Sequence, residues 1–230
     1  MTRTPPNRRS VRDIAHENGL LLACVGLFGV FFLGMIVSGA ATYNEEQREH
    51  GSTEQISVLQ YLATGDFVEA TFENWESEFL QMGMYVVLTA FLYQKGSSES
   101  KPLNKPAPQD ADPREASNRN APWPVKRGGW PLAVYERSLA IAFFALFFAS
   151  WALHAIGGVS AFNEEQVQHG QAAISLWGYM TSSQFWFESM QNWQSEFIAV
   201  AAIIGLSIVL RQRGSAESKP VADPNRETSA

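Results

Sequence analysis

The chain has 230 residues, a net charge of -6 and a mean hydropathy of -0.12, values that taken alone suit a soluble acidic protein. That average hides long apolar segments between polar ones, so a purely soluble class is excluded. A single cysteine, Cys24, excludes an intramolecular disulfide, and the sequence has no glycine-rich phosphate loop, cysteine pair or Ser/His/Asp arrangement.

Residues 1–17 are basic, and we expect them to form a cytoplasmic tail. The apolar segment that follows is long enough to cross the roughly 30 Å hydrocarbon core of a bilayer as a helix. Basic residues before an apolar run also fit a cleavable signal peptide, but a similar segment recurs in mid-chain, where no signal peptide lies. We therefore predict a first transmembrane helix over residues 20–40.

The next segment joins this helix to a second one. Its apolar residues Ile56, Leu59 and Leu62 are close to helical spacing, and Asp66 with Glu69 resembles a capping box. We expect an ordered, partly helical outer loop, a second helix that begins outside the membrane, and a crossing over residues 75–94.

Residues 96–129 are rich in Pro, Ser, Asn, Asp, Lys and Arg. Such a composition buries little apolar surface, so we predict a disordered cytoplasmic linker. Two further apolar segments predict transmembrane helices over residues 138–158 and 193–211, followed by a cytoplasmic tail at 214–230.

Three motifs occur once in each half of the chain. N-E-E-Q-x-x-H-G begins at Asn44 and at Asn163, N-W-x-S-E-F begins at Asn74 and at Asn192, and G-S-x-E-S-K-P follows the second apolar segment of each half. These recurrences predict an internal duplication into a first hairpin repeat at 18–95 and a second at 130–213. The expected fold class is an all-α integral membrane protein with four transmembrane helices in two tandem, parallel helical hairpins.

Basic residues give the orientation. Arg48 is the only Lys or Arg in the two segments that join the helices of a hairpin, whereas the tails and the linker are rich in both. Because cytoplasmic flanks carry the excess of Lys and Arg, we predict cytoplasmic termini, acidic outer loops and a bacterial inner-membrane location.

The three motifs in combination resemble those of an uncharacterised family of small bacterial membrane proteins known only as a domain of unknown function. The resemblance covers nearly the whole chain outside the tails and the linker. It implies a bacterial origin and a two-hairpin membrane domain, and it brings no catalytic residue.

Carboxylates beside an apolar segment are costly, so the N-W-x-S-E-F motif is a candidate site. Glu78 is retained as Glu196 in the second half, whereas Glu76 is replaced by Gln194. The expected role is either ion uptake or support of the outer loops through backbone hydrogen bonds. Trp75 and Trp193 are expected to anchor the helices at the interface, and the candidate polar site at the outer face comprises Glu78, Glu196, Asn74, Asn192, Ser77 and Ser195.

A metal site is a further hypothesis. Glu46 with His50, and Glu165 with His169, are four residues apart and would share one face of a helix. Carboxylate-bridged di-metal sites in helix bundles use Glu and His three apart, so the alternative is that both histidines end short helices. No cofactor is expected, and His154 has no partner histidine at the matching depth that would hold a haem.

The preferred function is a non-enzymatic structural or partner-binding membrane component with acidic outer loops. The alternative is a small proton- or cation-linked transporter that uses Glu78 and Glu196, and a metal-binding membrane enzyme comes third. Expected partners are the lipid bilayer and a membrane or extracytoplasmic protein or a second copy of the chain, without nucleic acid.

Overall fold

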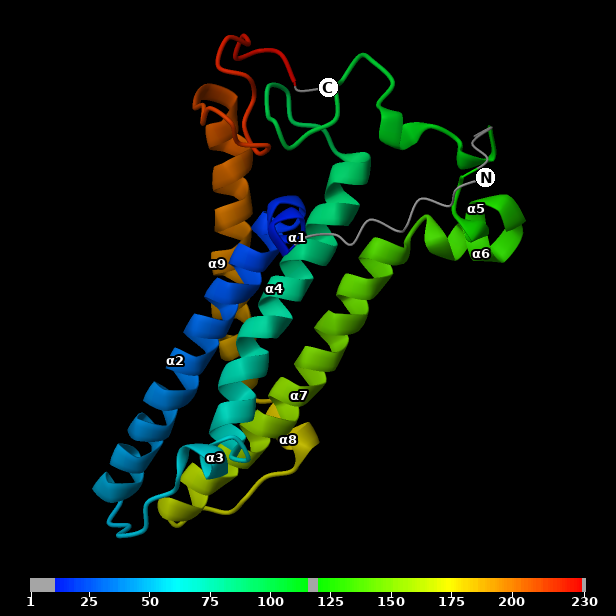
Figure 1. Cartoon of the computed structure of the whole chain (residues 1–230). Coiled ribbons are helices and arrows are strands. Elements are labelled where there is room, and N and C mark those ends of the chain that lie inside the picture. The colour runs from blue at the N-terminus through cyan, green and yellow to red at the C-terminus, as the bar shows by residue number, and fades with distance from the viewer. Residues whose placement is uncertain (1–10, 116–119, 229–230) are drawn as a thin grey trace, which may run out of the picture. The chain divides into compact units, whose positions relative to one another are not determined.

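A computed structural model describes residues 11–115 and 120–228 of the chain. The other residues, including most of the predicted N-terminal tail, lie outside the described part. All regular secondary structure in the described part is helical, which confirms the predicted all-α class (Figure 1). The chain divides into two compact units, Met1–Phe67 and Val68–Ala230, and each is described by itself.

The first unit contains α1 (Val11–Glu17), α2 (Gly19–Glu49) and α3 (Val58–Tyr61). Helix α2 includes the predicted first transmembrane segment and continues through the N-E-E-Q motif. Its 31 residues span about 46 Å, which exceeds the roughly 30 Å of a hydrocarbon core. Large apolar side chains such as Leu20 and Phe31 are exposed along it, as expected for a surface that contacts lipid.

The loop between α2 and α3 is held by a side chain near each of its ends, Asn44 and Ser57. The Asn44 amide bonds both backbone groups of Ile56, at 2.9 and 2.8 Å, and Ser57 forms a capping box with Gln60 at the start of α3. Buried Tyr61 lies against Gly39, where a Cβ would meet its ring. The predicted order and partial helicity of this loop therefore have a local physical basis.

The second unit contains three long helices and several short elements. The long ones are α4 (Gly65–Phe91), which starts at the end of the first unit, α7 (Ser138–Gln168) and α9 (Ser183–Val209). The short α8 (Leu176–Met180) lies between α7 and α9. Within the described residues, α2, α7 and α9 are the three helices long and apolar enough to cross a membrane.

The loop between α7 and α8 repeats the contacts of the first unit. The Asn163 amide bonds both backbone groups of Ile174, at 2.9 and 2.7 Å, and Ser175 caps α8. Tyr179 is fully buried against Gly158, where a Cβ would meet its hydroxyl. These contacts involve the residues that correspond to Asn44, Ile56, Ser57, Tyr61 and Gly39.

Residues 96–129 contain short helices, although the sequence predicts no structure there. They are the 3-10 helices η1 (Pro108–Asp110) and η2 (Pro113–Glu115) and the helix α5 (Trp123–Arg127), with α6 (Gly129–Tyr135) following. Tyr85 donates a 2.5 Å hydrogen bond to Glu99, and Lys101 forms a 2.6 Å ion pair with Asp110. Local polar contacts, which composition does not reveal, therefore hold the part before residue 116.

The C-terminal tail folds back beside the end of α4. Ser98 donates to the backbone oxygen of Glu217 at 2.8 Å, and the amide of Gly96 donates to Thr228 at 3.0 Å. The Lys219 ammonium, which is 2% exposed, donates to the backbone oxygens of Pro224, Asn225 and Glu227.

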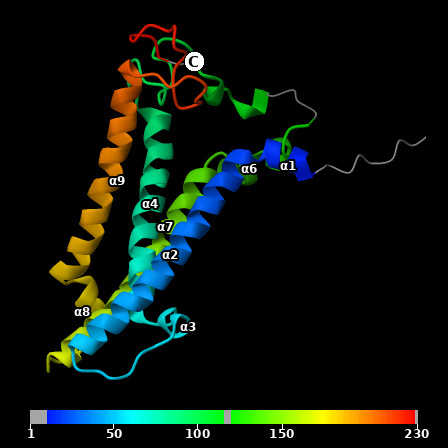
Figure 2. The ribbon, with the colours of Figure 1, turned by 60° about the vertical axis from the view of Figure 1, so that its left-hand side comes forward.

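Helix α4 packs against both α7 and α9 (Figure 2). On α7, Gly157 lets the backbones approach so closely that a Cβ there would lie 2.5 Å from the backbone nitrogen of Glu69. On α9, Gln81 of α4 donates to the backbone oxygen of Glu196 at 2.9 Å. Polar side chains on the first turns of α4 are thereby brought against both neighbours.

Candidate functional site

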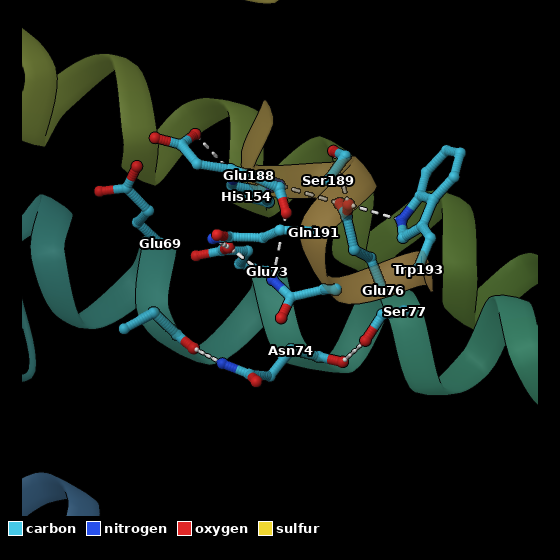
Figure 3. A network of polar contacts seen from close by, with 12 residues as sticks. Glu69, Glu73, Asn74, Glu76, Ser77, His154, Glu188, Ser189, Gln191 and Trp193 are labelled. Atoms are coloured by element: carbon cyan, nitrogen blue, oxygen red, sulfur yellow. Dashed lines mark hydrogen bonds and ion pairs between the residues drawn. The ribbon is translucent and has the colours of Figure 1, made fainter. Parts of the chain in front are cut away.

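A polar cluster lies where α4 meets α7, α8 and α9, and Figure 3 shows its members on α4, α7 and α9. We call it the carboxylate–histidine cluster. Three of its carboxylates are spaced at i, i+4 and i+7 on α4, so they share one face of that helix. Its members are Glu69, Glu73 and Glu76 of α4, His154 of α7, Tyr179 of α8 and Glu188 of α9.

The centre of the cluster is the contact between Glu76 and His154, and both side chains are completely buried. His154 Nδ1 lies 3.0 Å from Glu76 Oε2. The other oxygen of Glu76 accepts hydrogen bonds from Ser189 Oγ at 2.8 Å and from Trp193 Nε1 at 3.1 Å. Three donors therefore surround Glu76 and fix the position of its carboxyl group.

Glu188 lies on the other side of the imidazole. Its Oε2 is 3.4 Å from His154 Nε2, close enough for an ion pair when the imidazole is protonated, and this nitrogen makes no hydrogen bond among the described residues. Tyr179 donates to the same oxygen at 2.6 Å, and Gln184 donates to Oε1 at 2.6 Å. Two hydrogen bonds thus hold the Glu188 carboxylate in place beside His154 Nε2, which makes no hydrogen bond among the described residues.

Glu69 and Glu73 complete the cluster. The Tyr179 hydroxyl lies 2.9 Å from Glu69 Oε1, but its single hydrogen is better placed on Glu188 at 2.6 Å. Glu73 Oε1 accepts from Asn192 at 2.5 Å and from Gln191 at 3.3 Å. Glu69 is therefore the carboxyl group with the weakest support in the cluster.

Aromatic rings form the apolar wall around these polar groups. The Phe185 ring lies 4.9 Å from the imidazole of His154, and it also contacts Tyr179 at 5.4 Å and Trp151 at 5.7 Å between centroids. The sequence Phe185-Trp186-Phe187, which could act as a wedge into lipid, thus places its first ring inside the protein and leaves the other two exposed. Low polarity strengthens every charge interaction inside this wall.

Negative charge in the cluster exceeds positive charge. The sequences of α4, α7, α8 and α9 contain no Lys or Arg, so His154 is the one group in the cluster that could be cationic. Four carboxyl groups face it. Burial raises the pKa of Glu69 from its usual 4.5 to about 7, and burial and the neighbouring carboxylates raise that of Tyr179.

The residues predicted from the N-W-x-S-E-F motif have different environments. Glu78 is exposed, while Glu196 is half-buried and close enough to Glu78 for their charges to interact. Asn74, Ser77 and Ser195 bond to backbone oxygens of their own helices. Figure 3 shows Asn74 and Ser77 bonding along α4, whereas Trp193, the predicted anchor, turns its indole nitrogen to Glu76.

Asn192 is the one residue of the predicted polar site that belongs to the surroundings of the cluster, through its bond to Glu73. The other predicted anchor, Trp75, stacks edge-on between Phe72 and Phe79 of its own helix. The residues of the polar site predicted from the sequence are therefore different from the members of the carboxylate–histidine cluster.

The predicted metal residues lie at the ends of α2 and α7. The Nδ1 atoms of His50 and His169 each lie 2.9 Å from a backbone oxygen, that of Glu46 and Glu165 respectively, and all four side chains are exposed. Both histidines are the C-caps of their helices, but these helices are 31 residues long, whereas the alternative expects short ones. Among the described residues, the potential metal ligands that lie together are Glu69, His154 and Glu188.

Sequence reasoning missed Glu76, His154 and Glu188. The sequence offers His154 no second histidine at a matching depth, but its partners in the structure are carboxylates. A signal was present in the stripe of Glu69, Glu73 and Glu76 along one helix face. It points to a shared environment, but the sequence does not show which helix faces it.

Comparisons with known proteins identify a family. The family described as a domain of unknown function (DUF6766) matches residues 11–230. Comparisons with curated proteins and with solved structures gave no match. The match covers both units and every member of the carboxylate–histidine cluster, so the chain belongs to the family of domain of unknown function DUF6766.

Proposed function

We propose that this protein is a non-enzymatic, polytopic membrane protein that takes up a cation, protons included, at the carboxylate–histidine cluster. The excess of carboxyl groups over cationic groups in the cluster carries the proposal, with Glu76 and Glu188 buried and Glu69 and Glu73 half-buried. Four carboxyl groups surround a single imidazole, and the helices that form the site contain no Lys or Arg. Because an uncompensated buried carboxylate is very costly, protons or a metal ion must supply the missing positive charge.

The place of the cluster along the helices supports a role in ion movement. His154 lies close to the end of the apolar segment of α7, and Glu188 precedes the apolar part of α9. Ionisable groups within membrane helices commonly mark ion pathways. A site at the end of the spans is suited to an entrance, and we assign uptake to Glu76, His154 and Glu188 in place of exposed Glu78 and half-buried Glu196.

We also propose four crossings, with α4 as the additional span. Its first half carries the carboxylates, which lower its mean hydropathy, while residues 79–92 are apolar. Two tandem repeats are supported by the recurring Asn and Tyr contacts beside α3 and α8. The remaining elements of this proposal are a bacterial inner membrane, cytoplasmic termini and acidic outer loops, which rest on the distribution of Lys and Arg.

A second candidate is a partner-binding membrane component. Its basis is the exposed acidic surface at the end of α2, formed by Glu45, Glu46 and Glu49, and the exposed Trp177 on α8. Acidic surfaces attract basic partners, and an exposed Trp beside polar groups is common at interfaces. In-cell crosslinking from residue 177 would test it, with either a second copy or another membrane protein as the captured species.

Vesicle flux tests the first candidate. Full-length protein in sealed vesicles would be given a membrane potential, and cation entry would be followed with a pH-sensitive dye and with metal-sensitive dyes. We expect uptake by the native protein and at least a tenfold lower rate for Glu76→Gln, because that change removes the charge that holds His154.

Glu78→Gln is the matched control, since it makes the same chemical change two residues away on the exposed face of α4. It should retain the native rate. Far-UV circular dichroism and size-exclusion profiles would establish that both variants fold. Equal rates in the two variants, or native rates no higher than those of empty vesicles, would exclude ion uptake at this cluster.

A further inference from the structure

We propose that Glu69, His154 and Glu188 bind a divalent first-row transition metal ion, with Glu76 as the positioning residue for His154. This inference rests on the proposed function, because it names the cation that the cluster takes up. It concerns a set of residues different from Glu46, His50, Glu165 and His169, the metal ligands that the motifs indicate.

The three ligand atoms already lie close together. One ligand atom from each of Glu69, His154 and Glu188 falls within 4.8 Å of the other two. Two ligands at about 2.0–2.1 Å from a tetrahedral ion are about 3.3 Å apart. The 3.4 Å between His154 Nε2 and Glu188 Oε2 matches this separation, so the distance between these two atoms suits a shared ion.

The state of His154 is the second, independent observation. Its side chain is fully buried, and its Nε2 is without a hydrogen-bond partner among the described residues. A buried polar atom without a partner carries a desolvation penalty. Metal coordination by the Nε2 lone pair would remove that penalty.

Glu76 makes Nε2 the available nitrogen. It accepts from Nδ1 at 3.0 Å, and it is itself fixed by Ser189 and Trp193. A carboxylate that holds the far nitrogen of a ligand histidine sets the tautomer and raises the basicity of the ligand. Here this support exists before any ion arrives.

The donor set indicates the class of ion. An imidazole nitrogen suits zinc, iron, copper and nickel better than the hard ions Mg²⁺ and Ca²⁺, which prefer oxygen ligands. No thiolate belongs to the cluster, and Cys24, the only cysteine, lies on α2. Two carboxylates with one imidazole therefore favour a divalent ion such as Zn²⁺, whose charge also offsets much of the buried surplus.

Metal titration tests the inference. Purified full-length protein, stripped with a chelator, would be titrated with Co²⁺ while its visible absorption is recorded, and Zn²⁺ affinity would follow from competition. We expect one ion per chain. Glu76→Gln should weaken binding by about 10- to 100-fold, and His154→Gln and Glu188→Gln by more than about 100-fold.

His169→Gln is the matched control, because it removes an exposed histidine that follows the same helix. It should leave the affinity unchanged. If His154→Gln does not fold, as judged by size exclusion and circular dichroism, Glu69→Gln takes its place, since Glu69 has the fewest hydrogen bonds in the cluster. Absence of stoichiometric metal in the native protein, or equal affinity in the folded cluster variant and His169→Gln, overturns the inference.

Failure of the metal site and failure of the proposed function give different results. Native protein that moves protons in vesicles but binds neither Co²⁺ nor Zn²⁺ disproves the metal site and leaves proton uptake standing. Native protein that binds one ion without any flux supports the metal site and disproves the transport role.

Discussion

Glu76 and Glu78 lie two residues apart on α4 and have opposite environments. Glu76 is completely buried and accepts three hydrogen bonds, whereas Glu78 is exposed. Two residues turn a helix by about 200°, so neighbouring carboxylates of one motif face different surroundings. The motif recurs with Glu78 retained and Glu76 replaced, but a motif comparison does not show which of the two carboxylates faces the neighbouring helices.

The pH dependence of stability should reveal Glu69. Burial raises its pKa from 4.5 to about 7, so in this range the folded protein keeps a proton that the unfolded chain has released. Its contribution to the free energy of unfolding is full below about pH 4.5 and is lost as the pH rises through 7. We expect the melting temperature of the native protein to fall between pH 5 and 8 relative to Glu69→Gln.

Thermal unfolding in detergent with a chelator present would measure this difference. Other groups face Glu69 and can titrate as well, namely Tyr179 from α8, Glu188 from α9, His154 from α7 and Glu73 from α4. Their contributions are largely common to both proteins. Parallel pH profiles for the native protein and the variant would contradict the role given to burial of Glu69.

At the scale of elements, the contact between α4 and α7 depends on a glycine. A Cβ at Gly157 would lie 2.5 Å from the Glu69 backbone nitrogen and 2.8 Å from a methyl carbon of Val68. We expect Gly157→Ala to separate the two helices and to lower the free energy of unfolding by about 1–3 kcal/mol. Thermal unfolding would show it as a lower melting temperature.

Gly205→Ala on α9 is the control for helix propensity. A Cβ at Gly205 meets no atom within 4 Å, so alanine there should be neutral or should stabilise the helix by up to about 1 kcal/mol. Equal melting temperatures for the two variants would show that the approach of α4 and α7 is not tight.

Elements with continuous apolar character could be predicted from the sequence. The predicted segments 20–40 and 138–158 lie within α2 and α7. The segment 193–211 lies within α9 except for its last two residues, which follow the end of that helix at Val209. The sequence does not predict that α2 and α7 continue through the N-E-E-Q motif. Its polar residues are compatible with a helix, but they lack the periodic apolar positions from which a helix is predicted. Helices in the linker were missed since short polar contacts such as Lys101–Asp110 leave no periodic signal.

At the scale of the whole molecule, the number of crossings decides which loops share a side. In a Cys24→Ala background, single cysteines at Thr53 and Gln171 should react with an impermeant maleimide added to intact cells. Cysteines at Asn104 and Ala216 should react only after permeabilisation, because four spans return the chain to the cytoplasm twice. If only one of Thr53→Cys and Gln171→Cys reacts in intact cells, the two loops lie on opposite sides of the membrane and α4 does not span it.

The site could not be predicted from the recurring motifs because its carboxylates and its histidine differ between the halves, although Tyr179 recurs as Tyr61. Gln194 corresponds to Glu76, Met35 to His154 and Ala70 to Glu188. A comparison that weights recurring residues passes over such positions. The site forms where α4 of the first repeat packs against α7 and α9 of the second. It can therefore be identified only once that packing is known.

The C-terminal tail has a practical consequence for producing the protein. Its backbone oxygens at Pro224, Asn225 and Glu227 are the partners of the Lys219 ammonium, and Thr228 accepts from the Gly96 amide. Trimming these polar residues to improve expression would remove the three backbone acceptors of the Lys219 ammonium and the Thr228 contact at the end of α4. Affinity tags should therefore extend the chain beyond residue 230 and leave the tail intact.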